Sequence, residues 1–366
     1  MINHNTKADL ILEDGSIFSG ISFGSQTPKS GEVVFNTGMV GYPESLTDPS
    51  YKGQILVLTY PLIGNYGIPS QTKDKHNIME HFESEKIHIQ GLIINDYSEK
   101  HSHWNAEKSL SDWLIEHNIP AISGIDTRAL TKKLREKGTM LGKIKIKDKE
   151  TEFYNPDKIN LVEKVSCKEI IRYGNSKTKI VLIDCGVKHN IIRCFLKRDI
   201  QIIRVPWDFD PQDLKEDFDA VFISNGPGDP AQCKSTIKNL KNLIKSDKNI
   251  PIFGICLGNQ LLALASGTKT YKLKYGHRSQ NQPCTDLKTN RSYITSQNHG
   301  FAINEKYLGK EWEVWFKNIN DGTVEGIRHK KRPIISVQFH PEANCGPTDT
   351  EYIFDDFIKM IEDAGK

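Results

Sequence analysis

Long apolar runs are missing from this sequence of 366 residues. No stretch of about 18 apolar residues occurs, which excludes a membrane-spanning helix. The first nine residues are polar and lack the apolar segment of a secretory signal. The seven cysteines are an odd number and include no C-x-x-C pair, which argues against a disulfide framework and a zinc knuckle. These absences predict a soluble protein in a reducing compartment, and we expect a cytoplasmic location.

A strong charge of either sign is also missing. Lys and Arg total 49 against 46 Asp and Glu, and no dense basic cluster is interleaved with aromatic residues. We therefore predict no nucleic-acid partner. The nucleotide-binding patterns G-x-x-x-x-G-K-[ST] and G-x-G-x-x-G are absent, so no phosphate loop is expected. His101 and His103 have no third candidate ligand nearby in the sequence, which predicts an ordinary loop there and no metal site.

The sequence does contain two regions that differ in their pattern of predicted strands and helices, in keeping with a length that favours two domains. Residues 1–147 mix short β-rich runs with amphipathic helices at 109–117 and 127–137, which predicts a smaller N-terminal β/α domain. Residues 148–177 are polar and are predicted to be a linker. Residues 178–366 alternate strands with helices, which predicts an α/β domain with a mostly parallel sheet. Such sheets bind ligands at the carboxyl ends of their strands.

One cysteine stands at a predicted corner between a strand and a helix. The sequence GICLG at residues 254–258 ends an apolar run and begins a helical one, with Cys256 at the turn. Glycines two residues before and after it permit the cramped backbone of a nucleophile elbow. A helix N-terminus favours thiolate over thiol, and the Leu257 N–H is free to hold an oxyanion. The alternative is an ordinary buried cysteine that ends a strand.

A histidine and a glutamate follow another predicted strand. Residues 334–339 form a mostly apolar run that ends at His340, and Glu342 lies two residues on, across a proline. A histidine there can act as general acid and base for the thiol. Glu342 can hold one imidazole nitrogen and fix its tautomer. Cys256, His340 and Glu342 are therefore candidates for a catalytic triad; the alternative is a surface strand end with a chance carboxylate nearby.

A glycine-containing loop supplies a third segment. The sequence SNGPGDP at residues 224–230 follows an apolar run. Gly226 and Gly228, on either side of a proline, can bring backbone amides close to a ligand. The Gly228 N–H is a candidate second oxyanion donor. Taken alone, this loop is more typical of a plain turn.

In this order, the three segments resemble those of the triad-type, class I glutamine amidotransferases. Further motifs narrow the resemblance to the small subunit of carbamoyl-phosphate synthetase, and it spans nearly the whole chain. The N-terminal motifs separate this subunit from other amidotransferases of the class. The motifs occupy residues 12–15, 31–38, 41–51, 125–131, 184–190, 261–265 and 297–301. The resemblance implies a flavodoxin-like class I amidotransferase domain at the C-terminal end.

The resemblance also implies a site and a reaction. Cys256, His340 and Glu342 would form the triad that hydrolyses L-glutamine. The ammonia would pass to a carbamoyl-phosphate synthetase large subunit or fused domain, for pyrimidine or arginine biosynthesis. ATP and Mg²⁺ would bind to that partner, and no cofactor or metal is expected in this chain. Glutamine would be held by Ser50, Gly226, Gly228, Leu257, Gln260, Asn298, Gly300 and Phe301.

Some features leave alternatives open. Asn259 occupies a position where this subfamily usually has His, which predicts a changed rate or partner coupling without loss of activity. The sequence at residues 60–67 and 205–208 is closer to the eukaryotic multifunctional pyrimidine-pathway enzymes than to bacterial subunits, as expected for a domain of a longer polypeptide. A catalytically silent regulatory or docking subunit is a second hypothesis. A sister amidotransferase that feeds another synthase is the third, and the N-terminal domain argues against it.

Overall fold

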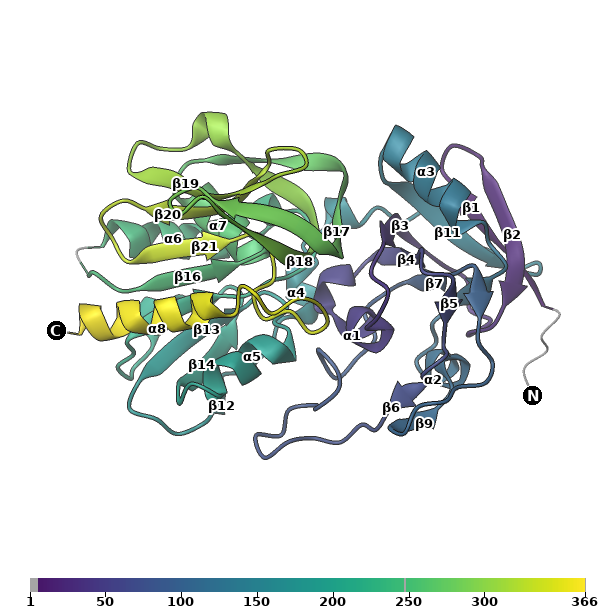
Figure 1. Cartoon of the computed structure of the whole chain (residues 1–366), viewed down its shortest axis with the longest axis horizontal. Helices are drawn as coiled ribbons and strands as arrows, with labels where there is room; N and C mark the ends of the chain where they lie inside the picture. The colour runs from purple at the N-terminus through teal and green to yellow at the C-terminus, as the bar shows by residue number, and fades with distance from the viewer. Residues whose placement is uncertain (1–5, 247, 366) are drawn as a thin grey trace. The chain divides into compact units, whose positions relative to one another are not determined.

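The chain divides into two units, Met1–Lys158 and Ile159–Lys366, in a computed structural model that describes residues 6–246 and 248–365 (Figure 1). Each unit has an apolar core of its own. The predicted linker, residues 148–177, falls on both sides of this division. Its second half contains α4 (Val162–Val165) and β12 (Ile171–Tyr173), and β12 pairs with a strand of the second unit. The second unit therefore begins well before residue 178.

The sheet of the first unit closes into a barrel with the strand order β1-β11-β3-β4-β7-β10-β2. Along β11, buried and half-buried residues alternate strictly, as expected for a strand with one face on a core. The barrel strands are β1 (Lys7–Leu12), β2 (Ile17–Ser22), β3 (Lys29–Asn36), β4 (Gln54–Leu58), β7 (Gly91–Ile93), β10 (Ala121–Ser123) and β11 (Met140–Ile146). Four short strands form two separate pairs: β5 (Leu62–Ile63) with β8 (Asp96–Tyr97), and β6 (Ile68–Pro69) with β9 (Ala106–Lys108).

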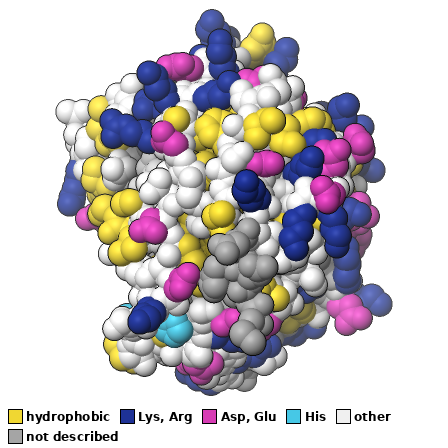
Figure 2. All heavy atoms as spheres, turned by 90° about the vertical axis from the view of Figure 1, so that its right-hand side faces the viewer, with side chains coloured by type: hydrophobic (Ala, Val, Ile, Leu, Met, Phe, Trp, Pro, Cys, Tyr) yellow, Lys and Arg dark blue, Asp and Glu magenta, His cyan; other side chains and the backbone are white. Residues whose placement is uncertain are grey.

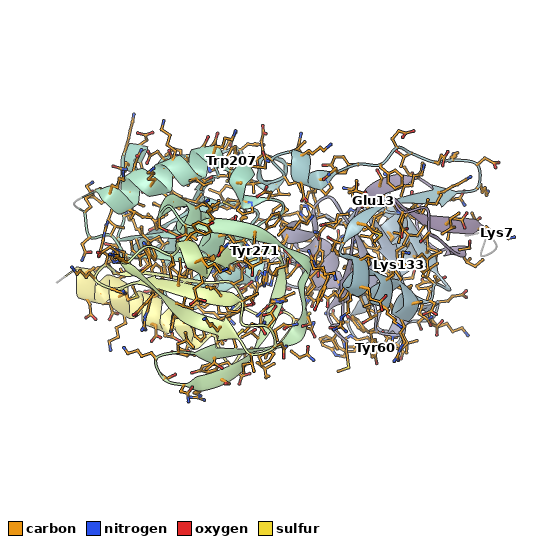
Figure 3. All side chains as sticks on the ribbon, turned by 90° about the horizontal axis from the view of Figure 1, so that it is seen from above. Lys7, Glu13, Tyr60, Lys133, Trp207 and Tyr271 are labelled. Atoms are coloured by element: carbon orange, nitrogen blue, oxygen red, sulfur yellow. The ribbon has the colours of Figure 1, made fainter. Side chains whose placement is uncertain are left out.

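The helices of the first unit are α1 (Tyr42–Thr47), α2 (Leu110–Glu116) and α3 (Thr127–Lys137), so both predicted helices are present. The α2 N-terminus is capped by Ser109 and the α3 N-terminus by Asp126, since each side chain accepts a hydrogen bond from a first-turn backbone N–H. Lys133, labelled on α3 in Figure 3, forms an ion pair of 2.7 Å with Asp14. These local signals explain why the two helices could be read from the sequence.

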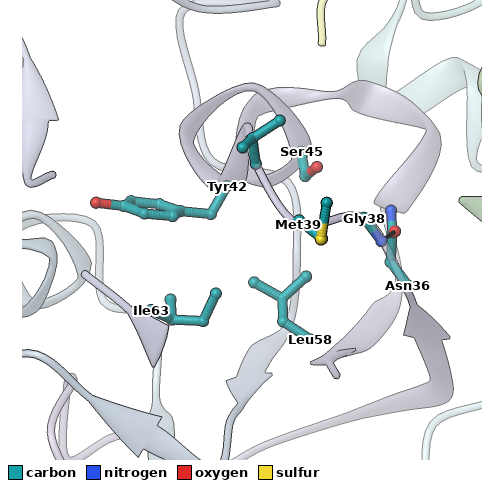
Figure 4. Close-up of a pocket in the computed structure, with 8 residues that line it drawn as sticks. Asn36, Gly38, Met39, Tyr42, Ser45, Leu58 and Ile63 are labelled. Carbon is teal, nitrogen blue, oxygen red and sulfur yellow. Dashed lines mark hydrogen bonds between the residues drawn. The ribbon is translucent and has the colours of Figure 1, made fainter. Parts of the chain in front are cut away.

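A small pocket opens in the first unit beside α1 (Figure 4). Tyr42, Leu58 and Ile63 line it together with Met39. Its volume is about 10 Å³, which is roughly the space of one water molecule. We therefore do not regard it as a substrate site.

Ten strands form the sheet of the second unit, in the order β12-β14-β13-β15-β16-β21-β20-β18-β17-β19. The five strands β14, β13, β15, β16 and β21 run parallel, and the others join antiparallel. The strands are β13 (Lys179–Asp184), β14 (Gln201–Pro206), β15 (Ala220–Ile223), β16 (Ile252–Ile255), β17 (Lys269–Asp286), β18 (Arg291–Asn304), β19 (Trp312–Asn318), β20 (Val324–His329) and β21 (Ile334–Val337). The predicted α/β class is confirmed, although only half of this sheet is parallel.

Helices cover both faces of the parallel strands (Figure 1). They are α5 (His189–Leu196), α6 (Lys234–Lys245), α7 (Leu257–Ala265) and α8 (Tyr352–Ala364). On one face Phe222 packs edge-on against Phe195 of α5 and Phe253 packs edge-on against Phe354 of α8, with ring centroids 5.0 and 5.9 Å apart. On the other face α6 and α7 bury apolar side chains of the same strands. Burial on both faces explains the continuous apolar runs of these strands.

The described residues include no helix long and apolar enough to cross a membrane. On the face shown in Figure 2, Lys and Arg side chains are interspersed with Asp and Glu. This mixture agrees with the balanced charge of the sequence.

Candidate active site

Cys256 stands where β16 ends and α7 begins. Its backbone φ is 55° and its ψ is −103°, a conformation that costs a residue with a Cβ roughly 1–3 kcal/mol. The Cys256 N–H donates to the carbonyl of Val337 at 2.8 Å, which ties the corner to β21. As the first helical residue, Leu257 has an N–H with no acceptor within its own helix. The predicted nucleophile-elbow geometry is therefore present at Cys256.

Two glycines make this corner sterically possible. A Cβ at Gly258 would lie 2.3 Å from the carbonyl oxygen of Ile223, and one at Gly254 would lie 2.7 Å from the Gly258 backbone. Both distances are far below ordinary contact, and the atoms that would clash are backbone atoms. The glycines at either side of Cys256 are thus required by the close approach of α7 to β15 and β16.

His340 and Glu342 follow β21, the neighbour of β16 in the sheet. The Nδ1 of His340 lies 2.6 Å from Oε1 of Glu342, and both side chains are almost completely buried. The Nε2 of His340 has no hydrogen-bond partner among the described residues. Because Nδ1 is held by the carboxylate, Nε2 is left for proton transfer.

A buried lysine completes the environment of the carboxylate. Lys188 Nζ lies 3.0 Å from Oε1 of Glu342 and donates to the carbonyl of Ala343 at 2.6 Å. Burial raises the pKa of Glu342, but Lys188 and His340 outweigh it and lower that pKa to about 2. Glu342 is therefore an anion at neutral pH, despite having no contact with solvent.

The imidazole of His340 is held in its charged form. Burial lowers the pKa of His340, but the Glu342 carboxylate and the Cys256 thiol raise it to about 10. Cys256 is thus close enough to His340 to act on its protonation. An imidazolium between a thiol and a buried carboxylate can stabilise a thiolate and later give up its proton.

Several of the residues expected to bind glutamine lie around Cys256. The thiol donates to the carbonyl of Asn298 at 3.7 Å. Gln260 donates to the carbonyl of Phe301 at 2.9 Å. A Cβ built on Gly226 would lie 2.8 Å from the Leu257 side chain. Strand β18, the loop after β15 and helix α7 therefore meet at the predicted site.

The remaining expected residues are placed as follows. Gly300 lies on β18 between Asn298 and Phe301, and Gly228 has a φ of 84° in the loop after β15. Ser50 belongs to the first unit, in the turn Pro49–Tyr51, where its N–H donates to Asp48 Oδ1 at 2.8 Å. The role of each of these residues in glutamine binding stays a prediction.

Sequence reasoning assigned no role to Lys188 or to Asp184, which positions it. The buried Asp184 accepts hydrogen bonds from the N–H groups of Gly186 and Val187, both at 2.9 Å, and so shapes the turn before Lys188. Arg204 pairs with Asp184 at 2.7 Å. The sequence does indicate these two residues, because Asp184 and Lys188 are charged residues that come just after an apolar run, within the motif at residues 184–190. The target of Lys188, Glu342, is too far away in sequence to be inferred from that motif.

Asn259 points into a buried polar network. It accepts a hydrogen bond from Ser336 at 2.8 Å and donates to Gln338 Oε1 at 3.2 Å. The same oxygen of Gln338 accepts from Gln260 at 3.0 Å. Asn259 therefore acts on the site through Gln338 and Gln260.

A larger cavity of about 400 Å³ lies elsewhere in the second unit. Asp219 and Pro251, which line it, stand at the amino ends of β15 and β16. Cys256 follows the carboxyl end of β16, so this cavity is at the opposite end of the strands. The candidate site therefore follows the rule for parallel sheets, and the large cavity does not.

Known proteins show similarity to both units. Residues 10–144 match the carbamoyl-phosphate synthase small chain, CPSase domain, and residues 181–360 match the glutamine amidotransferase class-I family. The chain is 49% identical over 366 residues to the carbamoyl phosphate synthase arginine-specific small chain of Saccharomyces cerevisiae, covering 98% of this chain and 89% of that one.

Two longer relatives are also similar. The multifunctional protein CAD of Squalus acanthias is 52% identical over 363 residues, and the multifunctional protein pyr1-3 of Dictyostelium discoideum is 50% identical over 380 residues. Each alignment covers 98% of this chain, but only 16% and 17% of these proteins. The chain therefore spans about a sixth of the length of these two multifunctional relatives.

Proposed function

Since the chain belongs to the carbamoyl-phosphate synthase small-chain family, we propose that it hydrolyses glutamine and supplies the ammonia for carbamoyl phosphate synthesis. The observation that carries this proposal is the elbow at Cys256 beside the buried His340–Glu342 pair. A thiol held at a strained corner, next to an oriented imidazole, suits attack on an amide. The family match supplies the substrate class.

In the proposed mechanism, the Cys256 thiolate attacks the side-chain amide carbon of glutamine. The N–H groups of Leu257 and Gly228 stabilise the oxyanion that forms. His340 donates its Nε2 proton to the departing nitrogen, the C–N bond breaks, and ammonia leaves a γ-glutamyl thioester. Water then adds to the thioester with His340 as base, and glutamate departs as the thiolate is restored.

The destination of the ammonia is part of the proposal. Free ammonia is protonated in neutral water and loses its nucleophilicity, so a synthetase must receive it directly. We propose a carbamoyl-phosphate synthetase large subunit or fused domain as the partner. ATP and Mg²⁺ would bind to that partner, and we propose no cofactor for glutamine hydrolysis in this chain. The assembly would be cytoplasmic. The names of the relatives support two forms of this partner: a separate large subunit, as with an arginine-specific small chain, and a domain fused in a multifunctional protein.

Glutamate release by a Cys256→Ser variant tests the chemistry. We expect at least a thousandfold loss relative to the unmodified chain, in line with the removal of a nucleophile. A Cys345→Ser variant is the matched control, since Cys345 is a partly exposed cysteine outside the proposed triad. Glutamate release by Cys256→Ser at the unmodified rate would refute the mechanism.

A catalytically silent docking subunit is the competing function. Labelling with a glutamine-mimicking electrophile separates the two, with and without the synthetase and ATP. We expect one label per chain, at Cys256, with a faster rate when the partner is present. A chain that stays unlabelled under both conditions would favour the silent subunit.

A further inference from the structure

Four buried polar side chains meet on three adjacent strands of the second unit, outside the proposed triad. His277 lies on β17, Gln297 and His299 on β18, and Glu325 on β20. One ligand atom from each of His277, His299 and Glu325 lies within 4.8 Å of the other two. The exposed fraction of every one of the four residues is 7% or less. No role in glutamine hydrolysis has been assigned to this group above.

The orientation of the Gln297 amide is fixed by its neighbours. The Thr295 hydroxyl donates its proton to the carbonyl of Gln282 at 2.8 Å, so it can only accept from Gln297. Gln297 Nε2 accordingly donates to Thr295 Oγ1 at 3.1 Å and to Cys284 Sγ at 3.2 Å. The amide oxygen of Gln297 therefore faces Nε2 of His299, at 3.1 Å.

His299 is consequently placed between two acceptors. Its Nδ1 lies 2.8 Å from the carbonyl of Phe301, and its Nε2 faces the Gln297 oxygen. A neutral imidazole has a single N–H, so when Nδ1 carries it, two lone pairs meet at Nε2. Glu325 Oε1 lies 3.9 Å from the same nitrogen. Glu325 Oε2 is buried and has no hydrogen-bond partner among the described residues.

We propose that this group binds one divalent transition-metal ion of the Zn²⁺ type. The ligands are His277 Nδ1, His299 Nε2, Gln297 Oε1 and the Glu325 carboxylate. Two imidazole nitrogens and two oxygens suit zinc and its neighbours. The bound cation removes the opposition of lone pairs at His299 and gives the unpaired oxygen of Glu325 a partner.

The distances between the ligand atoms fit a tetrahedral site. Zinc bonds of about 2.0–2.1 Å require ligand atoms roughly 3.3 Å apart. His277 Nδ1 lies 3.2 Å from Glu325 Oε1, His299 Nε2 lies 3.1 Å from Gln297 Oε1, and His299 Nε2 lies 3.9 Å from Glu325 Oε1. Two of these three distances match the tetrahedral spacing, and the bound ion would draw the remaining ligand atoms together. On binding, any proton between His277 Nδ1 and Glu325 passes to solvent.

An outer layer of hydrogen bonds orients both imidazoles, as is usual at metal sites. The other nitrogen of His277 lies 2.9 Å from Asp321 Oδ2, and Asp321 is itself held by the N–H and hydroxyl of Thr323 at 3.0 and 2.8 Å. The other nitrogen of His299 donates to Phe301. Each ring thus presents the nitrogen that faces the group. The ion would join β17, β18 and β20.

Titration of the full chain with Co²⁺ tests the site, in a Cys256→Ala background that removes a competing thiol. We expect one Co²⁺ per chain, the visible absorption of tetrahedral cobalt, no sulfur-to-cobalt charge transfer, displacement by Zn²⁺ and a rise in melting temperature. Glu325→Gln should weaken binding at least about 100-fold and Asp321→Asn about 10- to 100-fold. The surface variant Glu305→Gln should bind as the parent does.

The Asp321→Asn variant guards against failure to fold, because the Asp321 side chain is 42% exposed. Absence of Co²⁺ binding by the folded parent would overturn the proposal. Equal affinity in the parent and the Glu325→Gln variant would overturn it as well, and so would charge-transfer bands from a cysteine ligand. None of these readouts depends on glutamine hydrolysis.

Discussion

Replacing Lys188 by Met tests how the carboxylate of the proposed triad is held. Glu342 is completely buried and is paired with Lys188 at 3.0 Å and with His340 at 2.6 Å. Lowering its pKa from the ordinary 4.5 to about 2 corresponds to about 3 kcal/mol of stability at neutral pH. The charge of Lys188 lowers this pKa more than the charge of His340 does. We expect Lys188→Met to reduce the free energy of unfolding by about 2–3 kcal/mol at pH 7.

The stabilisation by the Glu342 carboxylate depends on pH. A carboxyl whose pKa is lowered on folding stabilises the protein above its unfolded pKa, near 4.5, and loses this contribution as the pH falls towards about 2. The difference in stability between the unmodified chain and Lys188→Met should therefore be constant above about pH 5 and shrink below pH 4.5. We also expect kcat for glutamine hydrolysis to fall by about 10- to 100-fold, since the Glu342 carboxylate loses the lysine that holds it and orients His340 less firmly.

Urea unfolding at a series of pH values measures the first effect, and glutamate release the second. Lys179→Met is the matched control, because Lys179 is a partly exposed lysine 3.9 Å from Glu216. A surface pair of this kind contributes at most about 1 kcal/mol. Equal stabilities of the two variants at pH 7 would refute the reasoning. A difference from the unmodified chain that stays unchanged down to pH 3 would refute it too.

Three further predictions concern the same site. Glu342→Gln removes the largest contribution that raises the pKa of His340 to about 10, so the high-pH loss of kcat/KM should move from near pH 10 towards neutrality; an unmoved limb in the pH–rate profile would contradict this. Gly258→Ala puts a Cβ 2.3 Å from the carbonyl oxygen of Ile223, so melting should show a loss of at least about 2 kcal/mol together with lost activity. Asn259→Ala should raise KM for glutamine more than it lowers kcat, measured by glutamate release, because the Gln338 side chain that contacts Gln260 loses one of its two hydrogen bonds; an unchanged KM would count against that network.

Local patterns were sufficient for the elements that carry the chemistry. The corner at Cys256 could be predicted because an apolar strand, two glycines and a helical run lie next to one another in the sequence. The helices α2 and α3 could be predicted from their caps and apolar periodicity. In each case the determining contacts are within a few residues of the element.

Contacts between distant segments were the ones that the sequence did not reveal. The sequence predicts a strand at residues 292–295, near the start of β18, and it does not predict β17. The 18 residues of β17 and the 14 residues of β18 are largely polar and contain register shifts that break the alternation. The closure of the first unit into a barrel depends on the pairing of β1 with β11, more than 120 residues away. The contact between Lys188 and Glu342 is likewise long-range. Pairings of this kind have no local signature.

The approach of Gly258 to Ile223 bears on how this site tolerates change over time. The height of Cys256 above the sheet is set by main-chain atoms of α7 and β15 in contact, with no side chain between them. Substitutions among the leucines and isoleucines on either side can therefore alter the packing of the core without moving the sulfur. Substitutions in the core are therefore expected to leave the position of the Cys256 sulfur unchanged, whereas Gly254 and Gly258 cannot be replaced without a clash with backbone atoms.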